Sequence, residues 1–123
     1  MKILVVDDNP DVFISTKAGL ELISDEFQVI GAESGKQCFD VLSEEVPDLI
    51  LLDLMMPKMN GWKVLEIIQS NIKWREIPIF IITASNNPEF QKTAEELGIV
   101  YIKKPFTIEN IKEKIDLLND QLK

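Results

Sequence analysis

Residues 49–61 read LILLDLMMPKMNG, a stretch that opens with an apolar run ending at an acidic residue. Its first four residues, Leu49 to Leu52, are aliphatic, and a continuous apolar run of this length predicts a strand that is covered on both faces. The ionisable Asp53 follows the run directly. Because an unpaired charge is costly to bury, Asp53 is expected to leave the core at the end of this strand, where a polar site would lie.

Further apolar runs predict strands of the same kind, and they recur at regular intervals along the chain. These runs are Ile3–Val6, Phe27–Ile30, Ile79–Ile82 and Val100–Ile102. Segments in which apolar residues recur with helical spacing lie between and after the predicted strands. The spacing is seen at Leu65, Ile68 and Ile72, at Phe90, Ala94 and Leu97, and at Ile108, Ile111, Ile115, Leu118 and Leu122.

Residues that typically begin or end helices support this division of the chain. The alternation of strands and helices predicts a doubly wound α/β fold, a parallel sheet of five strands in the order 2-1-3-4-5 with five helices on its faces. At 123 residues, one domain spanning residues 1–123 is expected. The helix signals are Asn9 before Pro10, Ser34 with Gln37, Asn60 before Gly61, and Gly98.

Polar residues follow several predicted strands at the edge where such sheets bind ligands. Each has a structural alternative when taken alone, as a helix cap, a loop residue, a strand end or an exposed turn lysine. Those alternatives do not explain why all of them fall at the same edge, so a functional site is favoured. The residues are Asp7 and Asp8 after the first strand, Asp53 after the third, Thr83 after the fourth and Lys104 after the fifth.

The chemistry of this group points to a divalent cation. Two carboxylates about 4 Å apart repel by roughly 4 kcal/mol at an effective dielectric near 20, so three of them demand a cation or shifted pKa values. Oxygen donors without His or Cys suit a hard ion, and Mg²⁺ fits best. A site with Mg²⁺, an ammonium, a hydroxyl and a spare carboxylate is equipped for phosphoryl transfer, with that carboxylate as the nucleophile.

The composition excludes several other classes of protein. A net charge of −8 disfavours direct binding to nucleic acid, and no apolar run approaches the roughly 20 residues that cross a bilayer. The chain has no histidine, which excludes His-based triads and a phosphohistidine donor role. The single Cys38 is expected in the core, and it fits the reducing cytoplasm, as does an N-terminus unlike a signal peptide.

Four segments together resemble the receiver domain of two-component response regulators, over the whole length of the chain. Each segment is weak alone, but their order and spacing are specific. The resemblance implies a flavodoxin-like fold with the topology argued above. The segments are ILVVDDNP at residues 3–10, LILLDLMMPKMNG at 49–61, IPIFIITAS at 77–85 and YIKKPF at 101–106.

The resemblance also implies roles for the acidic residues. Asp53 matches the phosphoacceptor of the family, which takes a phosphoryl group from a sensor histidine kinase or a phosphotransfer protein. Asp7 and Asp8 match the acidic pair that holds Mg²⁺, together with Asp53 and the backbone carbonyl of Met55. Within this pair, the resemblance favours Asp8 as the direct ligand of the ion.

Residues beyond the acidic group match other parts of the family pattern. Thr83 and Lys104 match the residues that contact the phosphoryl group, and Thr83 is also half of the conformational switch. Tyr101 matches the aromatic residue that changes rotamer with it, and the bond to Pro105 is expected to be cis. The side chains of Met55 and Ser85 occupy positions that influence the phosphoryl lifetime, and a thioether at Met55 implies slow hydrolysis.

The implied function is a phosphorylation-dependent signalling switch and not a turnover enzyme. Its fourth helix, fifth strand and fifth helix would control a downstream protein target, and dimerisation of the phosphorylated form stays open. An initiating Met1 and a chain that ends with the last helix favour a stand-alone receiver over a fragment of a larger regulator. A Mg²⁺-dependent aspartyl phosphatase is disfavoured, because that class needs a second aspartate where this chain has Met55.

Overall fold

The fold is an alternation of five strands and five helices, as the sequence predicts. The computed structural model describes residues 1–56 and 60–121. In chain order the elements are β1 (Lys2–Val6), α1 (Pro10–Ile23), β2 (Gln28–Ala32), α2 (Gly35–Glu44), β3 (Leu49–Asp53), α3 (Gly61–Ser70), β4 (Ile79–Thr83), α4 (Pro88–Glu96), β5 (Val100–Lys103) and α5 (Ile108–Gln121).

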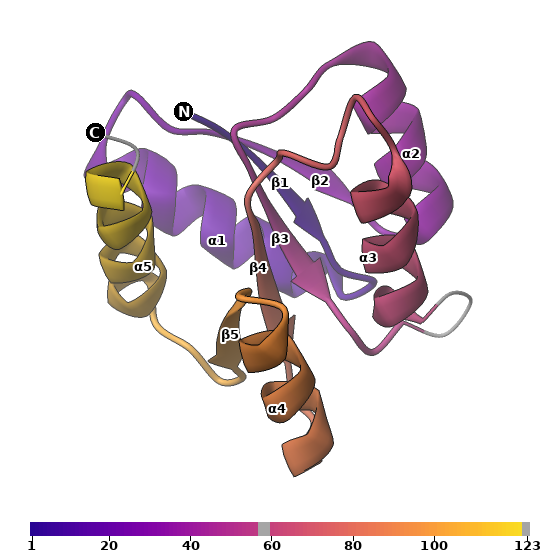
Figure 1. The fold of residues 1–123 in the computed structure, drawn as a ribbon. Coiled ribbons are helices and arrows are strands. Elements are labelled where there is room, and N and C mark those ends of the chain that lie inside the picture. The colour runs from indigo at the N-terminus through magenta and orange to yellow at the C-terminus, as the bar shows by residue number, and fades with distance from the viewer. Residues whose placement is uncertain (57–59, 122–123) are drawn as a thin grey trace.

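The strands form one parallel sheet in the order β2-β1-β3-β4-β5, which confirms the predicted topology. Figure 1 shows α1 and α5 on one face of this sheet and α2 and α3 on the other. Only β2 differs clearly from its predicted bounds, since it starts after Phe27 and continues through Gly31 and Ala32. Both added residues pair with β1, and backbone pairing does not require an apolar side chain.

Two separate apolar cores lie on the two faces of the sheet. Leu4 and Ile50 belong to the core beneath α2 and α3, whereas Ile3 and Leu49 belong to the core beneath α1 and α5. Successive strand residues point to opposite faces, so adjacent residues of one strand enter different cores. The four apolar residues of β3 are buried, as expected for a strand covered on both faces. The expectation that Asp53 leaves the core is wrong, because Asp53 is the last residue of β3 and is itself buried.

The predicted apolar faces of the helices are correct except near two helix ends. Ile111 and Ile115 of α5 are fully buried, while the predicted Leu122 lies outside the described residues. The prediction for Ile72 is wrong, because α3 ends at Ser70 and the residue is 78% exposed. Leu97 is likewise exposed, since the α4 helix has ended at Glu96.

The predicted helix starts and stops are present. The side chains of Asn9, Ser34 and Asn60 accept hydrogen bonds from the first turns of α1, α2 and α3. Gly98 follows α4 with a positive φ of 69°, a conformation that glycine adopts without steric cost. Its N–H donates to the carbonyl of Glu95, which ends the helix with a common glycine motif.

Side chains of α1 cover part of the outer edge of β2. The N–H of Val29 donates to Glu21 Oε2 at 3.0 Å, and Lys17 Nζ donates to the carbonyl of Val29 at 3.2 Å. Lys17 and Glu21 also form an ion pair at 2.8 Å. The Lys17 hydrogen bond, followed by that from Val29, lowers the pKa of Glu21. This strand edge therefore has its outward backbone groups at Val29 occupied.

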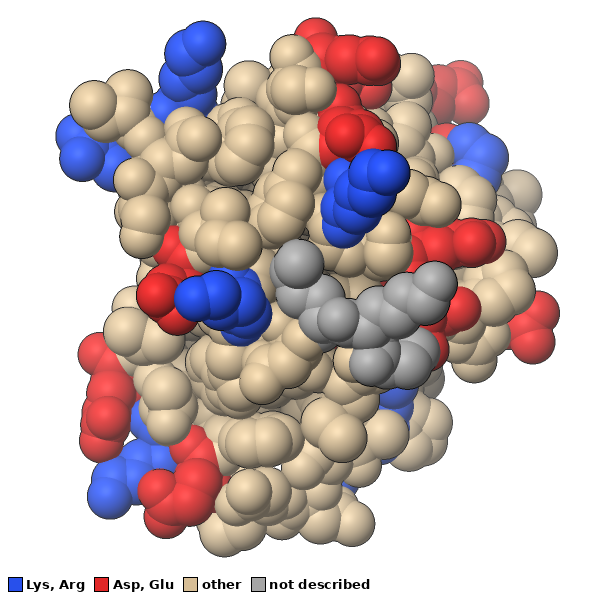
Figure 2. Space-filling view, turned by 90° about the vertical axis from the view of Figure 1, so that its right-hand side faces the viewer, with Lys and Arg blue, Asp and Glu red and all other residues tan. Residues whose placement is uncertain are grey.

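Charges of both signs are distributed over the surface. Figure 2 shows the side of the molecule that carries α2 and α3, where Lys and Arg side chains lie beside Asp and Glu with broad uncharged areas between them. Among the described residues, no helix combines the length and the apolar character needed to cross a membrane. Cys38 is fully buried in α2, as predicted, and burial raises the pKa of its thiol to about 12.

Candidate functional site

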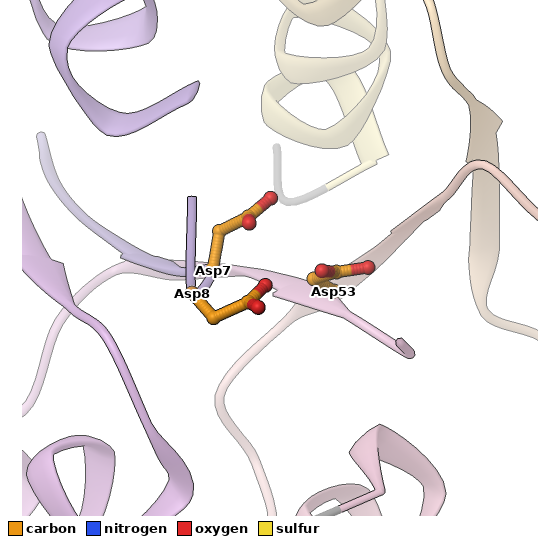
Figure 3. A group of neighbouring side chains, drawn as sticks. All are labelled: Asp7, Asp8 and Asp53. Atoms are coloured by element: carbon orange, nitrogen blue, oxygen red, sulfur yellow. The ribbon is translucent and has the colours of Figure 1, made fainter. Parts of the chain in front are cut away.

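Three aspartates meet at the carboxyl ends of β1 and β3. Val6 of β1 pairs with Leu52 of β3, so the residues that follow them, Asp7 and Asp53, leave neighbouring strands at the same level. One carboxylate oxygen from each of Asp7, Asp8 and Asp53 lies within 4.8 Å of the others. Figure 3 shows the Asp8 side chain directed toward Asp53. The sequence prediction that these residues converge therefore agrees with the geometry.

Lys104 brings a positive charge to the same group. Its Nζ lies 2.8 Å from Asp7 Oδ2 and 3.6 Å from Asp53 Oδ2. The backbone N–H of Lys104 donates to the carbonyl of Thr83, which fixes the start of the loop after β5. The Lys104–Pro105 peptide bond is cis, in agreement with the expectation for this position. The ammonium thus faces the two most deeply buried carboxylates.

Asp7 is part of the site and does not cap the first helix. Its side chain is buried, with Oδ2 bound to Lys104 and Oδ1 accepting the N–H of Asn9 at 2.9 Å. The cap of α1 is Asn9 itself, whose side chain accepts the N–H of Asp11. Asp8 is exposed, and its side chain bonds neither to Lys104 nor to the first turn of α1. The structural alternative of a helix cap therefore applies to Asn9.

Asp53 is buried to 2% exposure and has few groups that stabilise its charge. Burial raises the pKa of this carboxyl from 3.8 to about 6, and the nearby charge of Asp7 adds to the rise. A hydrogen bond from the N–H of Met55 to Asp53 Oδ1 at 3.1 Å opposes the shift, as does the charge of Lys104. The carboxylate form of Asp53 thus lacks enough positive charge around it.

The donor set fits a magnesium ion. The cluster offers oxygen atoms only, and no described His or Cys reaches it, which suits a hard cation. The raised pKa of Asp53 is a second sign that positive charge is lacking. The structure contains an acidic cluster that can hold a metal ion, with Asp7, Asp8 and Asp53 as the side-chain donors.

Thr83 and Tyr101 are linked to each other through the backbone of Ser85. Thr83 ends β4 fully buried, and its Oγ1 accepts the N–H of Ser85 at 3.1 Å. The hydroxyl of the half-buried Tyr101 is 3.5 Å from the carbonyl of Ser85, a long and weak hydrogen bond. Burial raises the pKa of the Tyr101 phenol. The loop after β4 thus joins the two residues that were predicted to switch together.

Gly61 belongs to the surroundings of the site, although the sequence indicated it only as a helix start. A Cβ atom at this position would overlap the carbonyl oxygen of Asp53 and lie 2.5 Å from Cα of Leu54. The N–H of Gly61 also donates to the carbonyl of Leu54 at 3.0 Å. Only the Asn60-Gly61 pair in the sequence hints at this contact.

Met55, which follows Asp53 by two positions, is 56% exposed.

Comparison with known proteins agrees with the resemblance that the sequence motifs indicate. A profile of the response regulator receiver domain matches residues 3–116. The chain is 34% identical to the chemotaxis protein CheY1 of Helicobacter pylori, with 96% of each chain covered. It is 36% identical over 114 residues to a probable cyclic di-GMP phosphodiesterase of Vibrio cholerae. The chain spans 25%, 46% and 43% of the length of the first three curated relatives that it matches.

Solved structures agree with the sequence relatives. The CheY-like receiver domain protein of Methanospirillum hungatei superposes with a TM-score of 0.85 at 26% identity, over 98% of this chain and 94% of that one. Receiver domains are signalling switches. Phosphodiesterase activity is named for the Vibrio cholerae protein, and this chain matches only 25% of the length of that protein. The chain belongs to the response regulator receiver domain family.

Proposed function

We propose that the protein is a phosphorylation-dependent signalling switch with residues 1–123 as one receiver domain and Asp53 as its phosphoacceptor. The observation that carries this proposal is the meeting of Asp7, Asp8, Asp53 and Lys104 at one end of the sheet. The donor would be the phosphohistidine of a sensor kinase or a phosphotransfer protein. One oxygen of Asp53 attacks phosphorus, the P–N bond breaks, and its electron pair returns to the imidazole.

Each residue of the group has a separate task in this reaction. Lys104 neutralises charge on the phosphoryl oxygens, for which its ammonium is already positioned between Asp7 and Asp53. Asp7, Asp8, Asp53 and the backbone carbonyl of Met55 would hold Mg²⁺. When bound, the ion supplies positive charge that offsets the carboxylates and the incoming phosphoryl oxygens.

The signal leaves the site through Thr83 and Tyr101. A phosphoryl group adds negative charge and three acceptor oxygens, one of which Thr83 Oγ1 can contact by giving up its bond with Ser85. The weak contact of Tyr101 with the same loop is then free to change, so the surface of α4, β5 and α5 is reshaped. A downstream protein, or a second copy of this chain, would bind that surface.

Incubation with acetyl phosphate and Mg²⁺, followed by intact mass analysis, tests the proposal. The wild type should gain one phosphoryl group, and Asp53→Asn should gain none. Asp48→Asn is a matched control, because Asp48 is an exposed aspartate at the opposite end of β3 and should leave phosphorylation unchanged. A wild type that stays unmodified, or an Asp53→Asn variant that is modified equally, would contradict the proposal.

The phosphoryl lifetime is governed, in our proposal, by the side chains of Met55 and Ser85. The exposed thioether of Met55 cannot orient an attacking water as an amide or acid could. We therefore expect the acyl phosphate to persist for minutes or longer. The same mass measurement, repeated over time after removal of the donor, checks this expectation for the wild type and for Met55→Asn. Decay within seconds in the wild type would contradict it.

A further inference from the structure

A shallow groove lies where α5 meets the end of α1, on the side of α5 away from α4 and β5 (Figure 1). Its volume is about 340 Å³, and Ile23 at the end of α1 lines it together with one face of α5. The two helices pack side by side (Figure 1). The α5 residues that line the groove are Glu109, Lys112, Glu113, Asp116, Leu117 and Asp120.

The floor of the groove is apolar and open to solvent. Ile23 is 48% exposed and Leu117 is 52% exposed, and Leu22 beside Ile23 is 88% exposed. The face of α5 that packs on the sheet is a different one, which includes Ile111 and Ile115. Single exposed apolar residues are common, but Ile23 and Leu117 line one groove and belong to neither apolar core.

The rim of the groove is acidic. Glu109, Glu113 and Asp116 follow one another at helical spacing along the same face of α5. Asp116 is paired with Lys112. Within residues 1–56 and 60–121, Glu109 and Glu113 form no ion pair, so their charges are available to an external cation.

From this combination we infer that the groove docks a basic amphipathic helix of a partner protein. An apolar stripe on such a helix would cover Ile23 and Leu117, and its flanking Lys or Arg residues would face Glu109 and Glu113. From position 109 to position 120, α5 rises about 16 Å, which matches about three turns of a docked helix. A second copy is a poor occupant, because it would set acidic rims against each other.

The groove is separate from the phosphorylation site. The α1 helix starts just after Asp8 and has 14 residues, so its end at Ile23 lies about 20 Å from its start. None of Asp7, Asp8 and Asp53 lines the groove. Binding there is therefore expected in the unphosphorylated protein, and its test does not depend on the function of Asp53.

The apolar half of the site can be tested with a fluorescein-labelled peptide of about 18 residues, with Leu on one helical face and Lys on the other. Fluorescence anisotropy should show saturable binding, and Leu117→Gln should weaken it about tenfold. Ile72→Gln is the matched control, because Ile72 is 78% exposed on another surface, and it should bind like the wild type. Equal losses in both variants would overturn the proposal.

The charged half needs a control for the net charge of the protein. Glu109→Gln with Glu113→Gln should weaken binding about tenfold, whereas Glu44→Gln with Glu96→Gln, which removes the same charge from α2 and α4, should not. A peptide of identical composition with a scrambled order should bind poorly to the wild type. Equal binding of the scrambled peptide, or equal effects of the two charge pairs, would reduce the interaction to general electrostatics and refute the site.

Two further measurements exclude other occupants. Asp53→Asn should bind the peptide like the wild type, and a loss of binding would place the peptide at the acidic cluster instead. Sedimentation of the wild type without peptide should give a monomer mass at the concentrations of the titration. A dimer that Leu117→Gln disrupts would show that the groove serves a second copy, and the proposal would fail.

Discussion

Asp53 combines deep burial with an ionisable carboxyl group, to which we assign the role of phosphoacceptor. Its surroundings provide one backbone donor and an ammonium at 3.6 Å, which leave the pKa of the carboxyl near 6. A carboxylate that is destabilised in its charged form gains more from a nearby cation than a solvated carboxylate does. The affinity for a cation that we propose for Asp53 and the cost of its charge to stability thus have the same physical origin.

This cost predicts a pH-dependent effect of Asp53→Asn on stability without metal. A pKa raised from 3.8 to about 6 means that the folded wild type loses stability as the pH rises through that range. In EDTA at pH 7.5, the variant should have a free energy of unfolding higher by up to about 3 kcal/mol, at about 1.4 kcal/mol per pKa unit. The difference between the variant and the wild type should vanish near pH 4. Urea titrations followed by tryptophan fluorescence, at a series of pH values, measure it.

Asp25→Asn serves as the control for this prediction, because Asp25 is an exposed aspartate of a surface turn. Its free energy of unfolding should follow the wild-type pH profile without the gain between about pH 4 and pH 6. A similar gain in both variants would mean that general charge repulsion, and not the burial of Asp53, sets the pH dependence.

Lys104 and its neighbour Lys103 provide a second matched pair. Lys104→Met would leave the buried carboxylate of Asp7 without its ion pair, and the free energy of unfolding in EDTA should fall by about 2–3 kcal/mol. Lys103 is exposed and forms no ion pair within the described part of the chain. Lys103→Met should therefore change the free energy of unfolding by at most about 0.5 kcal/mol. Chemical denaturation of both variants measures the difference, and equal losses would contradict it.

The identities of the site residues could be predicted from the sequence, but their contacts could not. Asp7, Asp8 and Asp53 each follow an apolar run, and that pattern alone implies that they leave the sheet at one edge. The position before Pro105 distinguished Lys104 from Lys103. Ser85, however, bonds to Tyr101 and to Thr83, which are 16 and 2 positions away from it, through its own backbone atoms. Bonds to backbone atoms do not depend on residue type, so the sequence does not predict them.

The start of α3 is joined to the end of β3 more closely than any side chain would allow. Gly61 lies at the first position of α3, against the backbone of Asp53 and Leu54. Gly98 follows α4 for a different reason, since its φ is positive and its surroundings are open. Two helix ends therefore require glycine, one because of space and the other because of backbone conformation.

These two glycines should respond differently to alanine. Gly61→Ala forces the backbone under Asp53 to move, so we expect a loss of about 3 kcal/mol in the free energy of unfolding together with slower phosphorylation by acetyl phosphate. Gly98→Ala should cost about 1–2 kcal/mol, the penalty for a left-handed residue, and leave the rate of phosphorylation unchanged. Denaturation curves and phosphorylation rates, measured on both variants, separate the two effects.

The helices and strands themselves were largely readable from local patterns. Where the interpretation failed, at Ile72 and Leu97, an apolar residue continued the helical spacing beyond the last helical turn. Asn71 accepts the N–H of Lys73 and so ends α3 before Ile72. Side-chain bonds of this kind compete with helix continuation, and the spacing of apolar residues does not include them.

The sheet order could be predicted for the molecule as a whole because few topologies are compatible with five alternating strands and helices. That order makes β1 and β3 neighbours, which brings Asp7 and Asp8 to Asp53 across more than forty intervening residues. Repulsion among the three carboxylates exists only in the folded protein, so it lowers the free energy of unfolding of the whole domain. Metal binding and global stability are consequently linked.

Mg²⁺ should therefore raise the melting temperature of the whole protein. At ten times its Kd the ion adds about 1.4 kcal/mol, which corresponds to a rise of about 3–6 °C for a domain of this size. Asp8→Asn, which removes an exposed member of the cluster, should lose most of that rise. Calorimetry in MgCl₂ and in NaCl of equal ionic strength measures it, and equal rises in both salts would contradict a specific site.

The cover that Glu21 and Lys17 place over Val29 has a consequence for how copies of this protein meet. An uncovered outer strand templates further strands, and sheets from separate molecules can then grow into fibres. At β2, a newcomer would first have to displace an ion pair and two bonds to the backbone. At Val29, this side of the sheet therefore resists the addition of a strand from another copy.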